Sequence, residues 1–185
     1  MALSGEAGRR AVLLVTGIQA AGKSTVAQRL AERLPRSAHV RGDVFRRMVV
    51  GGRAEMTPEP SAEALAQLRL RHRLTAATCD EYFAAGFTVV AQDVVLGEHL
   101  TEMTRLVRAR PLLVVVLAPR AEVVEAREAA RAKDAYVHWK AGPLDAVLRE
   151  RTPRLGLWLD TSEQTPEETV EEILARAWTE ARVGG

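Results

Sequence analysis

The chain has 185 residues, of which 47% are hydrophobic and 27% are charged, with a formal net charge of +2. This composition is typical of one globular domain with a sizeable core, which we expect to span residues 1–185. The single Cys79 excludes an intrachain disulfide, and no apolar run approaches the roughly 18 residues that cross a bilayer. The first apolar run is also too short for the core of an export signal, so we expect a cytoplasmic protein without membrane contact.

Strands and helices are predicted to alternate along the chain. Residues 11–16 form a short continuous apolar run, which is typical of a strand buried on both faces. After a glycine-rich turn, a helix is predicted at 23–34, where Pro35 ends it. The later predicted strands lie at 38–41, 87–91, 112–117 and 155–160, and the later predicted helices at 43–50, 61–85, 98–109, 120–132, 144–151 and from 165 onward. Five short strands separated by helices imply an α/β fold in three layers, with a parallel five-stranded sheet and helices on both faces.

Local signals mark several element boundaries. Residues 51–60 carry two glycines and two prolines, which predicts a loop, and Ser61 is a suitable N-cap for the long helix that follows. Thr165, Pro166 and Glu168 fit the N-cap, N1 and N3 positions of a capping box at the start of the last helix.

A phosphate-binding motif follows the first predicted strand. Residues 17–24 read GIQAAGKS and fit G-x-x-x-x-G-K-[ST] at every fixed position, between a buried strand and a helix. The two glycines let the backbone wrap closely around phosphate, so that main-chain N–H groups and the helix N-terminus face the anion. Lys23 is expected to reach the β- and γ-phosphates, and the Ser24 hydroxyl to bind Mg²⁺. The residues expected to contact the nucleotide are Gly17, Ala20, Ala21, Gly22, Lys23, Ser24 and Thr25.

A carboxylate and an arginine follow the second predicted strand. Asp43 and Arg46 stand three residues apart, and ligands of open parallel sheets bind beyond the carboxyl ends of the strands. Asp43 is therefore a candidate base for an attacking hydroxyl, and Arg46 a candidate for holding an anionic or polar group of the acceptor. The alternative is that Asp43 only caps the short helix and Arg46 is a surface cation.

With this motif, the Asp-x-x-Arg pair and this element order, the chain resembles small P-loop kinases of the nucleoside-monophosphate-kinase type. The chloramphenicol-phosphotransferase-like and polynucleotide-kinase-like branches are closest in pattern, and the resemblance covers most of the chain. It implies the strand order 2-3-1-4-5, a catalytic base at Asp43, and a mobile lid after the fourth strand, here about residues 120–143. It also implies ATP (or GTP) with Mg²⁺.

Arginines in that predicted lid are candidates for contact with the phosphates. Arg127 and Arg131 stand four residues apart and face the same side of the predicted helix. A guanidinium pair suits the charge that develops on a transferring phosphoryl group, so both are candidate catalytic residues and Arg127 also a nucleotide contact. Arg120 is a weaker candidate. The alternative is a solvated helix whose glutamates pair with these arginines.

Weaker signals complete the prediction. Asp93 ends the third predicted strand, where it is a candidate either for Mg²⁺ or for a hydrogen bond to the substrate. Residues 69–73 carry three arginines and His72, which a nucleic acid could contact, but a solvated helix face is favoured because no aromatic residues interleave. His138 and Trp139 follow the lid helix, where a substrate could pass.

The sequence thus predicts an ATP-dependent kinase that phosphorylates a hydroxyl of a small molecule, such as an antibiotic or a sugar-like metabolite. A nucleotide or polynucleotide 5′-kinase is the alternative within the same chemistry. A nucleotide-dependent switch is the alternative of another class, which Asp43, Arg46 and the arginine-bearing lid disfavour.

Overall fold

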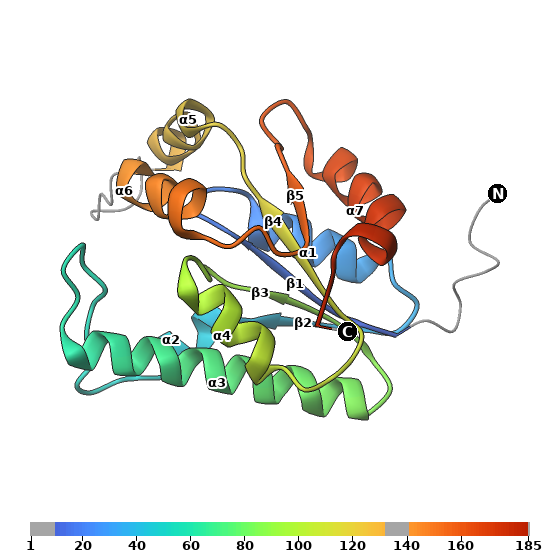
Figure 1. Cartoon of the computed structure of the whole chain (residues 1–185), viewed down its shortest axis with the longest axis horizontal. Coiled ribbons are helices and arrows are strands. Elements are labelled where there is room, and N and C mark those ends of the chain that lie inside the picture. Colours follow the sequence, from blue (N-terminus) through green and yellow to red (C-terminus); the bar gives the residue numbers. More distant parts are fainter. Residues whose placement is uncertain (1–9, 132–140, 185) are drawn as a thin grey trace.

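The structure is a computed structural model that describes residues 10–131 and 141–184. Its strands and helices alternate along most of the chain (Figure 1). In chain order the elements are β1 (Val12–Gly17), α1 (Lys23–Glu32), β2 (Ser37–Arg41), α2 (Gly42–Arg47), α3 (Ala62–Ala84), β3 (Thr88–Gln92), α4 (Glu98–Leu106), β4 (Leu112–Leu117), α5 (Ala121–Arg131), α6 (Ala141–Ala146), the π-helical turn η1 (Val147–Arg151), β5 (Leu157–Leu159), α7 (Pro166–Glu180) and β6 (Arg182–Val183).

The main sheet is parallel and has the order β2-β3-β1-β4-β5, which confirms the predicted fold class and strand order. β1 lies at its centre, paired with β4 from Val12↔Leu112 to Gly17↔Leu117. The two-residue β6 adds an antiparallel pair to β4, and the sequence analysis missed it because two residues are too short to show a strand pattern.

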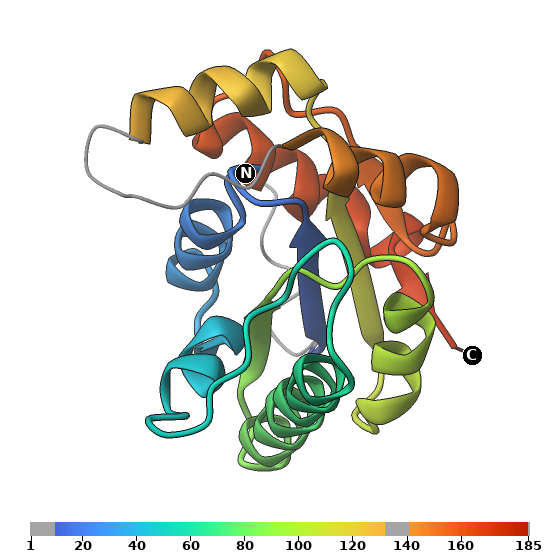
Figure 2. The same cartoon turned by 90° about the vertical axis from the view of Figure 1, so that its left-hand side faces the viewer.

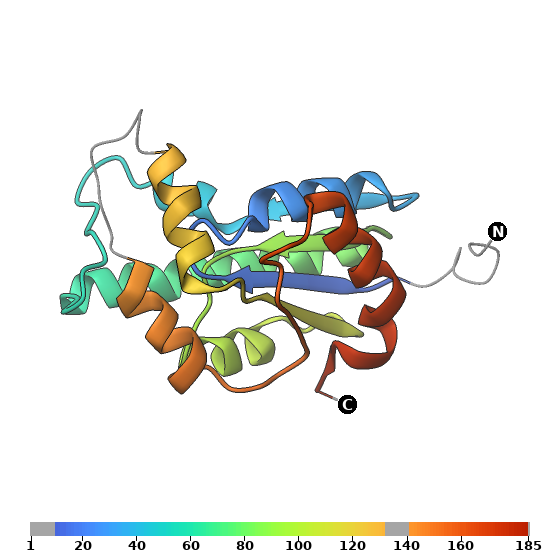
Figure 3. The same ribbon diagram turned by 90° about the horizontal axis from the view of Figure 1, so that it is seen from above.

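Helices cover both faces of the sheet. Figure 3 shows α1 and α7 on one face and α3 and α4 on the other, while α5 and α6 lie beyond the carboxyl ends of the strands. All residues of β1, β3 and β4 are buried, as expected for strands covered on both faces. The largest fully buried side chains are mostly Leu, with Ile18, Ile173, Met103 and His72. Aliphatic residues therefore build the core, in agreement with the low aromatic content.

The predicted boundaries hold best where a cap marks them. The Ser61 hydroxyl accepts a hydrogen bond from the Ala64 N–H at 3.1 Å and starts α3. The capping box of α7 is present in full, with Thr165 as N-cap and Glu168 at N3. The predicted helix at 144–151 differs, since α6 ends at Ala146 and continues as a π-helical turn. None of the helices in the described ranges is long and apolar enough to cross a membrane.

Candidate active site

The phosphate-binding loop connects β1 to α1 at the carboxyl edge of the sheet. Gly22 is the N-cap of α1 and has φ of 93°, a left-handed conformation that favours glycine. Gly17 is required for another reason as well, because a Cβ there would lie 2.5 Å from the Leu117 carbonyl oxygen of β4. The first turn of α1 contains no acidic residue, so its N–H groups and the positive end of the helix dipole remain suited to an anion.

Lys23 lies largely buried inside this loop. Its Nζ donates a hydrogen bond to the Ile18 carbonyl oxygen at 2.6 Å. Ile18 is itself buried in the core, so this hydrogen bond connects the lysine to a residue that anchors the loop to the core. The ammonium group has three donors, and one of them binds the Ile18 carbonyl oxygen of the phosphate-binding loop.

Beside the loop, two hollows flank the start of α1. One cavity of about 220 Å³ lies between the phosphate-binding loop and the segment that leads from β5 into α7. Ala20, Ala21 and Gly22 line its loop side, and Thr161 and Pro166 line the other. Arg127 of α5 also lines it, and the Arg127 Nη2 donates to the Thr161 carbonyl oxygen at 3.3 Å. The cavity is therefore bordered directly by the phosphate-binding loop.

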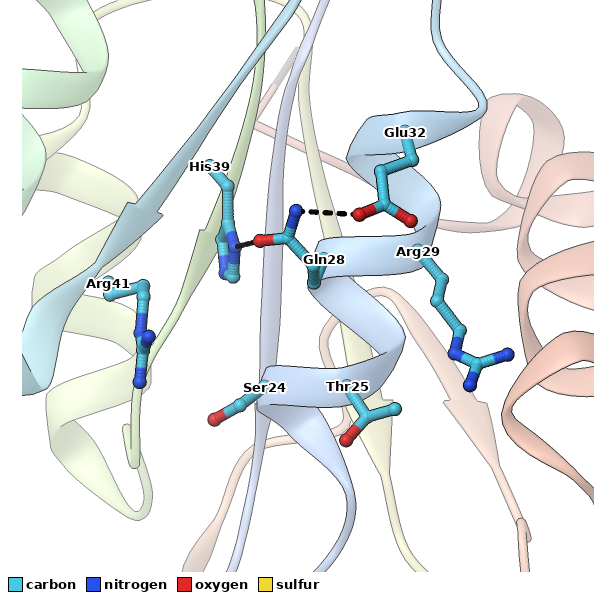
Figure 4. A pocket seen from close by; sticks show the side chains of 7 residues that line it. All are labelled: Ser24, Thr25, Gln28, Arg29, Glu32, His39 and Arg41. Atoms are coloured by element: carbon cyan, nitrogen blue, oxygen red, sulfur yellow. Dashed lines mark hydrogen bonds between the residues drawn. The ribbon is translucent and has the colours of Figure 1, made fainter.

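The second hollow is a groove of about 500 Å³ between α1 and β2 (Figure 4). It runs from Ser24 and Thr25 along α1, and a chain of hydrogen bonds lines it. The Gln28 side chain donates to Glu32 at 2.9 Å and is 2.8 Å from His39 Nδ1. Arg41 stands at the end of the groove near Ser24 and is 3.7 Å from the Asp43 carboxylate. The groove therefore opens toward the residues expected to carry the chemistry.

Asp43 is the second residue of α2 and does not cap it. The N-cap of α2 is Arg41, which makes no side-chain capping bond, so the alternative that Asp43 serves as the cap is wrong. Asp43 Oδ2 accepts a hydrogen bond from Arg47 Nη2 at 2.7 Å, while Oδ1 accepts none. The carboxylate is thus held between Arg41 and Arg47, and its Oδ1 atom is buried without a hydrogen-bond partner.

Asp93 is fully buried at the end of β3 and paired with Arg71 of α3. Arg71 Nε donates to Asp93 Oδ2 at 2.7 Å, and Arg71 Nη2 donates to Oδ1, which also accepts from the Val94 N–H at 2.7 Å. A Cβ at Gly42 would collide with the same carboxylate, so the start of α2 also packs against it. Both oxygens of Asp93 are therefore engaged within the protein, which favours a role in holding the site together.

The sequence analysis missed Arg71 as a site residue. Arg71 and His72 were predicted to belong to a basic cluster, for which a solvated helix face was favoured over a nucleic-acid contact, and for these two the solvated face is wrong. The Arg71 side chain is 15% exposed, and burial lowers its pKa to about 10, which leaves it charged at neutral pH. His72 is buried. Arg71 stands seven residues after the buried Ala64, two helical turns along the sheet-facing side of α3, and this spacing could have identified it.

Arg46 points to the 51–60 loop. Its Nη2 donates to Glu55 Oε2, so Arg46 and Glu55 link α2 to this loop. In the predicted lid, Arg120 pairs with Glu122 and Glu163, while Arg127 lines the 220 Å³ cavity beside the phosphate-binding loop. The Arg131 side chain, His138 and Trp139 lie outside the described residues.

The arrangement also fits the bound ion that the motif implies. Mg²⁺ in phosphate sites takes only one or two protein oxygens and receives its other ligands from phosphate and water. The exposed Ser24 hydroxyl at the phosphate-binding loop meets that requirement. The described residues contain no group of three or more His, Cys, Asp and Glu that would form a dedicated metal cage.

Comparison with known proteins places the chain in a family. A family model described as an AAA domain matches residues 12–154. The chain belongs to this AAA-domain family. No curated protein matches it in sequence.

Solved structures show the same fold at low sequence identity. A sugar kinase from Janibacter sp. HTCC2649 is 20% identical with a TM-score of 0.63, covering 90% of this chain and 92% of that chain. The tunicamycin resistance protein of Deinococcus radiodurans is 18% identical with a TM-score of 0.66, covering 95% and 100%. The APS kinase of Mycobacterium tuberculosis, solved with AMPPNP and APS, is 19% identical with a TM-score of 0.65, covering 90% and 96%. The P-loop kinase fold of this AAA-domain protein is thus shared with proteins that are named for different substrates.

Proposed function

We propose that the protein is an ATP-dependent kinase that transfers the γ-phosphate to a hydroxyl of a small molecule, such as an antibiotic or a sugar-like metabolite. One observation carries the proposal. The phosphate-binding loop and Asp43 both lie at the carboxyl edge of the sheet, and Asp43 Oδ1 accepts no hydrogen bond. The similar structures of a sugar kinase and of an antibiotic resistance protein support this substrate class.

ATP (or GTP) would bind with its phosphates in the loop at residues 17–24 and its base in the cavity beside Arg127. The backbone N–H groups at the start of α1 and the Lys23 ammonium neutralise the phosphates. A guanidinium plane and a proline ring suit the two faces of a flat base, and Arg127 and Pro166 both line this cavity. Ser24 would hold Mg²⁺, which when bound offsets negative charge on the phosphate oxygens.

In the chemical step, the acceptor hydroxyl oxygen forms a bond to the γ-phosphorus while the bond from that phosphorus to the bridging oxygen of ADP breaks. Asp43 orients the hydroxyl and takes its proton, so the products are the phosphorylated acceptor, ADP and one proton. Lys23 and the lid arginines Arg127 and Arg131 oppose the charge on the phosphoryl oxygens. Asp93, held by Arg71, fixes the relation between β3, α2 and α3 around Asp43.

Among acceptors of a phosphoryl group, a polynucleotide is disfavoured because the basic cluster at 69–73 is only partly exposed to solvent. Arg71 is paired with Asp93 and His72 is buried, so two of its four members do not face solvent as a phosphate-binding patch would. A switch is disfavoured because it would need no base directed at an acceptor.

A screen for ATP consumption tests the proposal. Purified protein is incubated with Mg²⁺·ATP and panels of hydroxylated antibiotics, sugars, aldonic acids and nucleosides, and ADP formation is measured. Lys23→Ala serves as the inactive reference because it removes the cation on the β- and γ-phosphates. We expect acceptor-dependent ADP formation that Lys23→Ala abolishes. Turnover that persists at the wild-type rate in Lys23→Ala would refute the proposal.

A further inference from the structure

The loop at residues 51–60 places a carboxylate between two arginines. Glu55 Oε2 accepts from Arg46 Nη2, and Glu55 Oε1 is 3.2 Å from Arg53 Nε. Each oxygen of this carboxylate therefore meets a different guanidinium group, one from α2 and one from the loop. A phosphate, a sulfate or a carboxylate of a ligand would be held by two arginines in the same manner.

This loop is fixed in position by a side chain of α3. Gln67 Nε2 donates to the Gly52 carbonyl oxygen at 2.8 Å, and Gln67 Oε1 accepts from the Ala54 N–H at 3.0 Å. These two hydrogen bonds hold the backbone on both sides of Arg53. Figure 2, which faces the carboxyl edge of the sheet, shows the loop running across that edge between α2 and α3. These contacts from α3 thus fix the backbone position of Arg53.

In the ion pairs formed by α2, the 51–60 loop and Asp93, arginines outnumber carboxylates. The arginines in this region are Arg41, Arg46, Arg47, Arg53 and Arg71, and the carboxylates are Asp43, Glu55 and Asp93. Asp93 is buried against Arg71, and Asp43 is the proposed base. Glu55 is the carboxylate that can leave its place without disturbing either of them.

Glu55 is also weakly held. The side chains of Arg46 and Arg53 are each 43% exposed and that of Glu55 is 55% exposed. Exposed ion pairs contribute little because water screens them and because two long side chains lose freedom. A ligand oxyanion that makes charge-assisted hydrogen bonds to both guanidinium groups can therefore displace Glu55.

Building on the proposed kinase function, we propose that the acceptor carries an oxyanion group that binds Arg46 and Arg53 in place of Glu55. Its reacting hydroxyl then lies at Asp43, which precedes Arg46 by nearly one turn of α2. Glu55 acts as an internal competitor, so it selects against acceptors that lack a negative charge. Arg53 and Glu55 are the specificity-determining residues that this inference adds to the site.

Anion binding tests the proposal without a known acceptor. The phosphate-binding loop is first saturated with Mg²⁺ and a non-hydrolysable ATP analogue. Sodium sulfate and sodium acetate are then titrated separately at constant ionic strength, and binding is measured by calorimetry. Sulfate represents a phosphate-like group and acetate a carboxylate, so the two titrations distinguish the kinds of oxyanion.

We expect Glu55→Gln to tighten binding of the preferred anion by up to about fivefold, because an exposed ion pair of up to about 1 kcal/mol no longer competes. Arg46→Gln and Arg53→Gln should each weaken it by about tenfold or more. Two variants serve as matched controls. Glu59→Gln removes a negative charge from the same loop as Glu55, and Arg73→Gln removes a positive charge from the exposed side of α3. Both should leave binding nearly unchanged. Equal binding in the wild type and Arg53→Gln, or an equal gain in Glu55→Gln and Glu59→Gln, would overturn the proposal.

Matched acceptor pairs separate this proposal from the kinase function. The phosphorylation rate of an aldonic acid is compared with that of its alditol, and that of a sugar phosphate with that of its free sugar. Phosphorylation of the charged member alone supports the proposal. Equal or preferred phosphorylation of the neutral members leaves the kinase function in place and refutes the oxyanion site. Absence of ATP binding refutes both.

Discussion

Asp43 has a local geometry that suits a base better than a structural residue. It makes no capping bond, and its ion pairs with Arg41 and Arg47 leave Oδ1 without a hydrogen bond. Its side chain is 40% exposed, so a change there should disturb folding little.

Asp43→Asn should therefore separate catalysis from binding. The amide keeps the shape but cannot accept the proton, and general-base catalysis contributes roughly 10²- to 10⁴-fold, so kcat should fall by about that factor. ATP affinity by calorimetry should change little, because in the proposed mechanism Asp43 contacts the acceptor and not the nucleotide. Steady-state turnover with an acceptor from the screen provides the comparison. If turnover is equal in both proteins, Asp43 is not the base.

Gly42 is a second residue whose role is local and testable. A Cβ there would overlap the Asp93 carboxylate, which is buried and cannot move without breaking its two bonds to Arg71. Gly42→Ala should destabilise the protein by about 1–3 kcal/mol through overpacking, and by more if the ion pair separates. Gly51→Ala is the matched control, since a Cβ at Gly51 meets no atom within 4 Å. Urea unfolding of the two variants measures the difference in stability. Equal unfolding midpoints would show that Asp93 does not pack against α2.

At the scale of elements, α3 joins several parts of the site. From one helix, Gln67 holds the 51–60 loop and Arg71 holds Asp93 at the end of β3. The next residue, the buried His72, packs against α4, where the centroid of its ring lies 5.7 Å from that of the His99 ring in a T-shaped arrangement. Burial, and then the charges of His99 and Arg71, lower the pKa of His72 to about 4, while Glu102 and the Val94 backbone act in the opposite direction.

The contact between α3 and α4 should therefore weaken in acid. The pKa of His72 is about 6.5 when unfolded and about 4 when folded, so between these values the unfolded chain binds more protons. Stability must then fall as the pH drops, with a loss attributable to His72 of about 2 kcal/mol between pH 7 and pH 5. His72→Leu cannot titrate and should lack this part of the loss. Urea unfolding at both pH values measures the difference, and an equal loss in the variant would exclude His72 as the responsible group.

Over the whole molecule, the features that sequence predicted are those encoded within a few residues. The phosphate-binding loop, the caps at Ser61 and Thr165 and the buried strand at 112–117 each depend on neighbours in the chain, and all are present. Arg71 and Asp93 are 22 residues apart, so no local pattern reveals their pairing. The hydrogen bonds from the Gln67 side chain to Gly52 and Ala54 could not be predicted from the sequence for the same reason. Packing between distant segments decides these contacts, and a single sequence does not display it.

Arg127 connects two parts of the molecule across the proposed nucleotide site. It extends from α5, which follows β4, to the carbonyl of Thr161 between β5 and α7, and it lines the cavity beside the phosphate-binding loop. A side chain in this position can contact the base and also bring the lid residues over the phosphates. From the sequence, Arg127 was predicted both as a contact of the nucleotide and as a catalytic residue.

Arg127→Ala should then lower both ATP affinity and kcat while leaving the acceptor KM unchanged. Loss of a guanidinium contact with the base is worth about 1–2 kcal/mol when desolvated, so the ATP dissociation constant should rise roughly tenfold. Arg120→Ala is the matched control, because Arg120 precedes the same helix but pairs with Glu122 and Glu163. Calorimetry with ATP beside steady-state kinetics gives both quantities. If kcat falls while ATP affinity is unchanged, Arg127 acts only in the transition state. If Arg127→Ala has the same ATP affinity and the same kcat as Arg120→Ala, Arg127 is not part of the site.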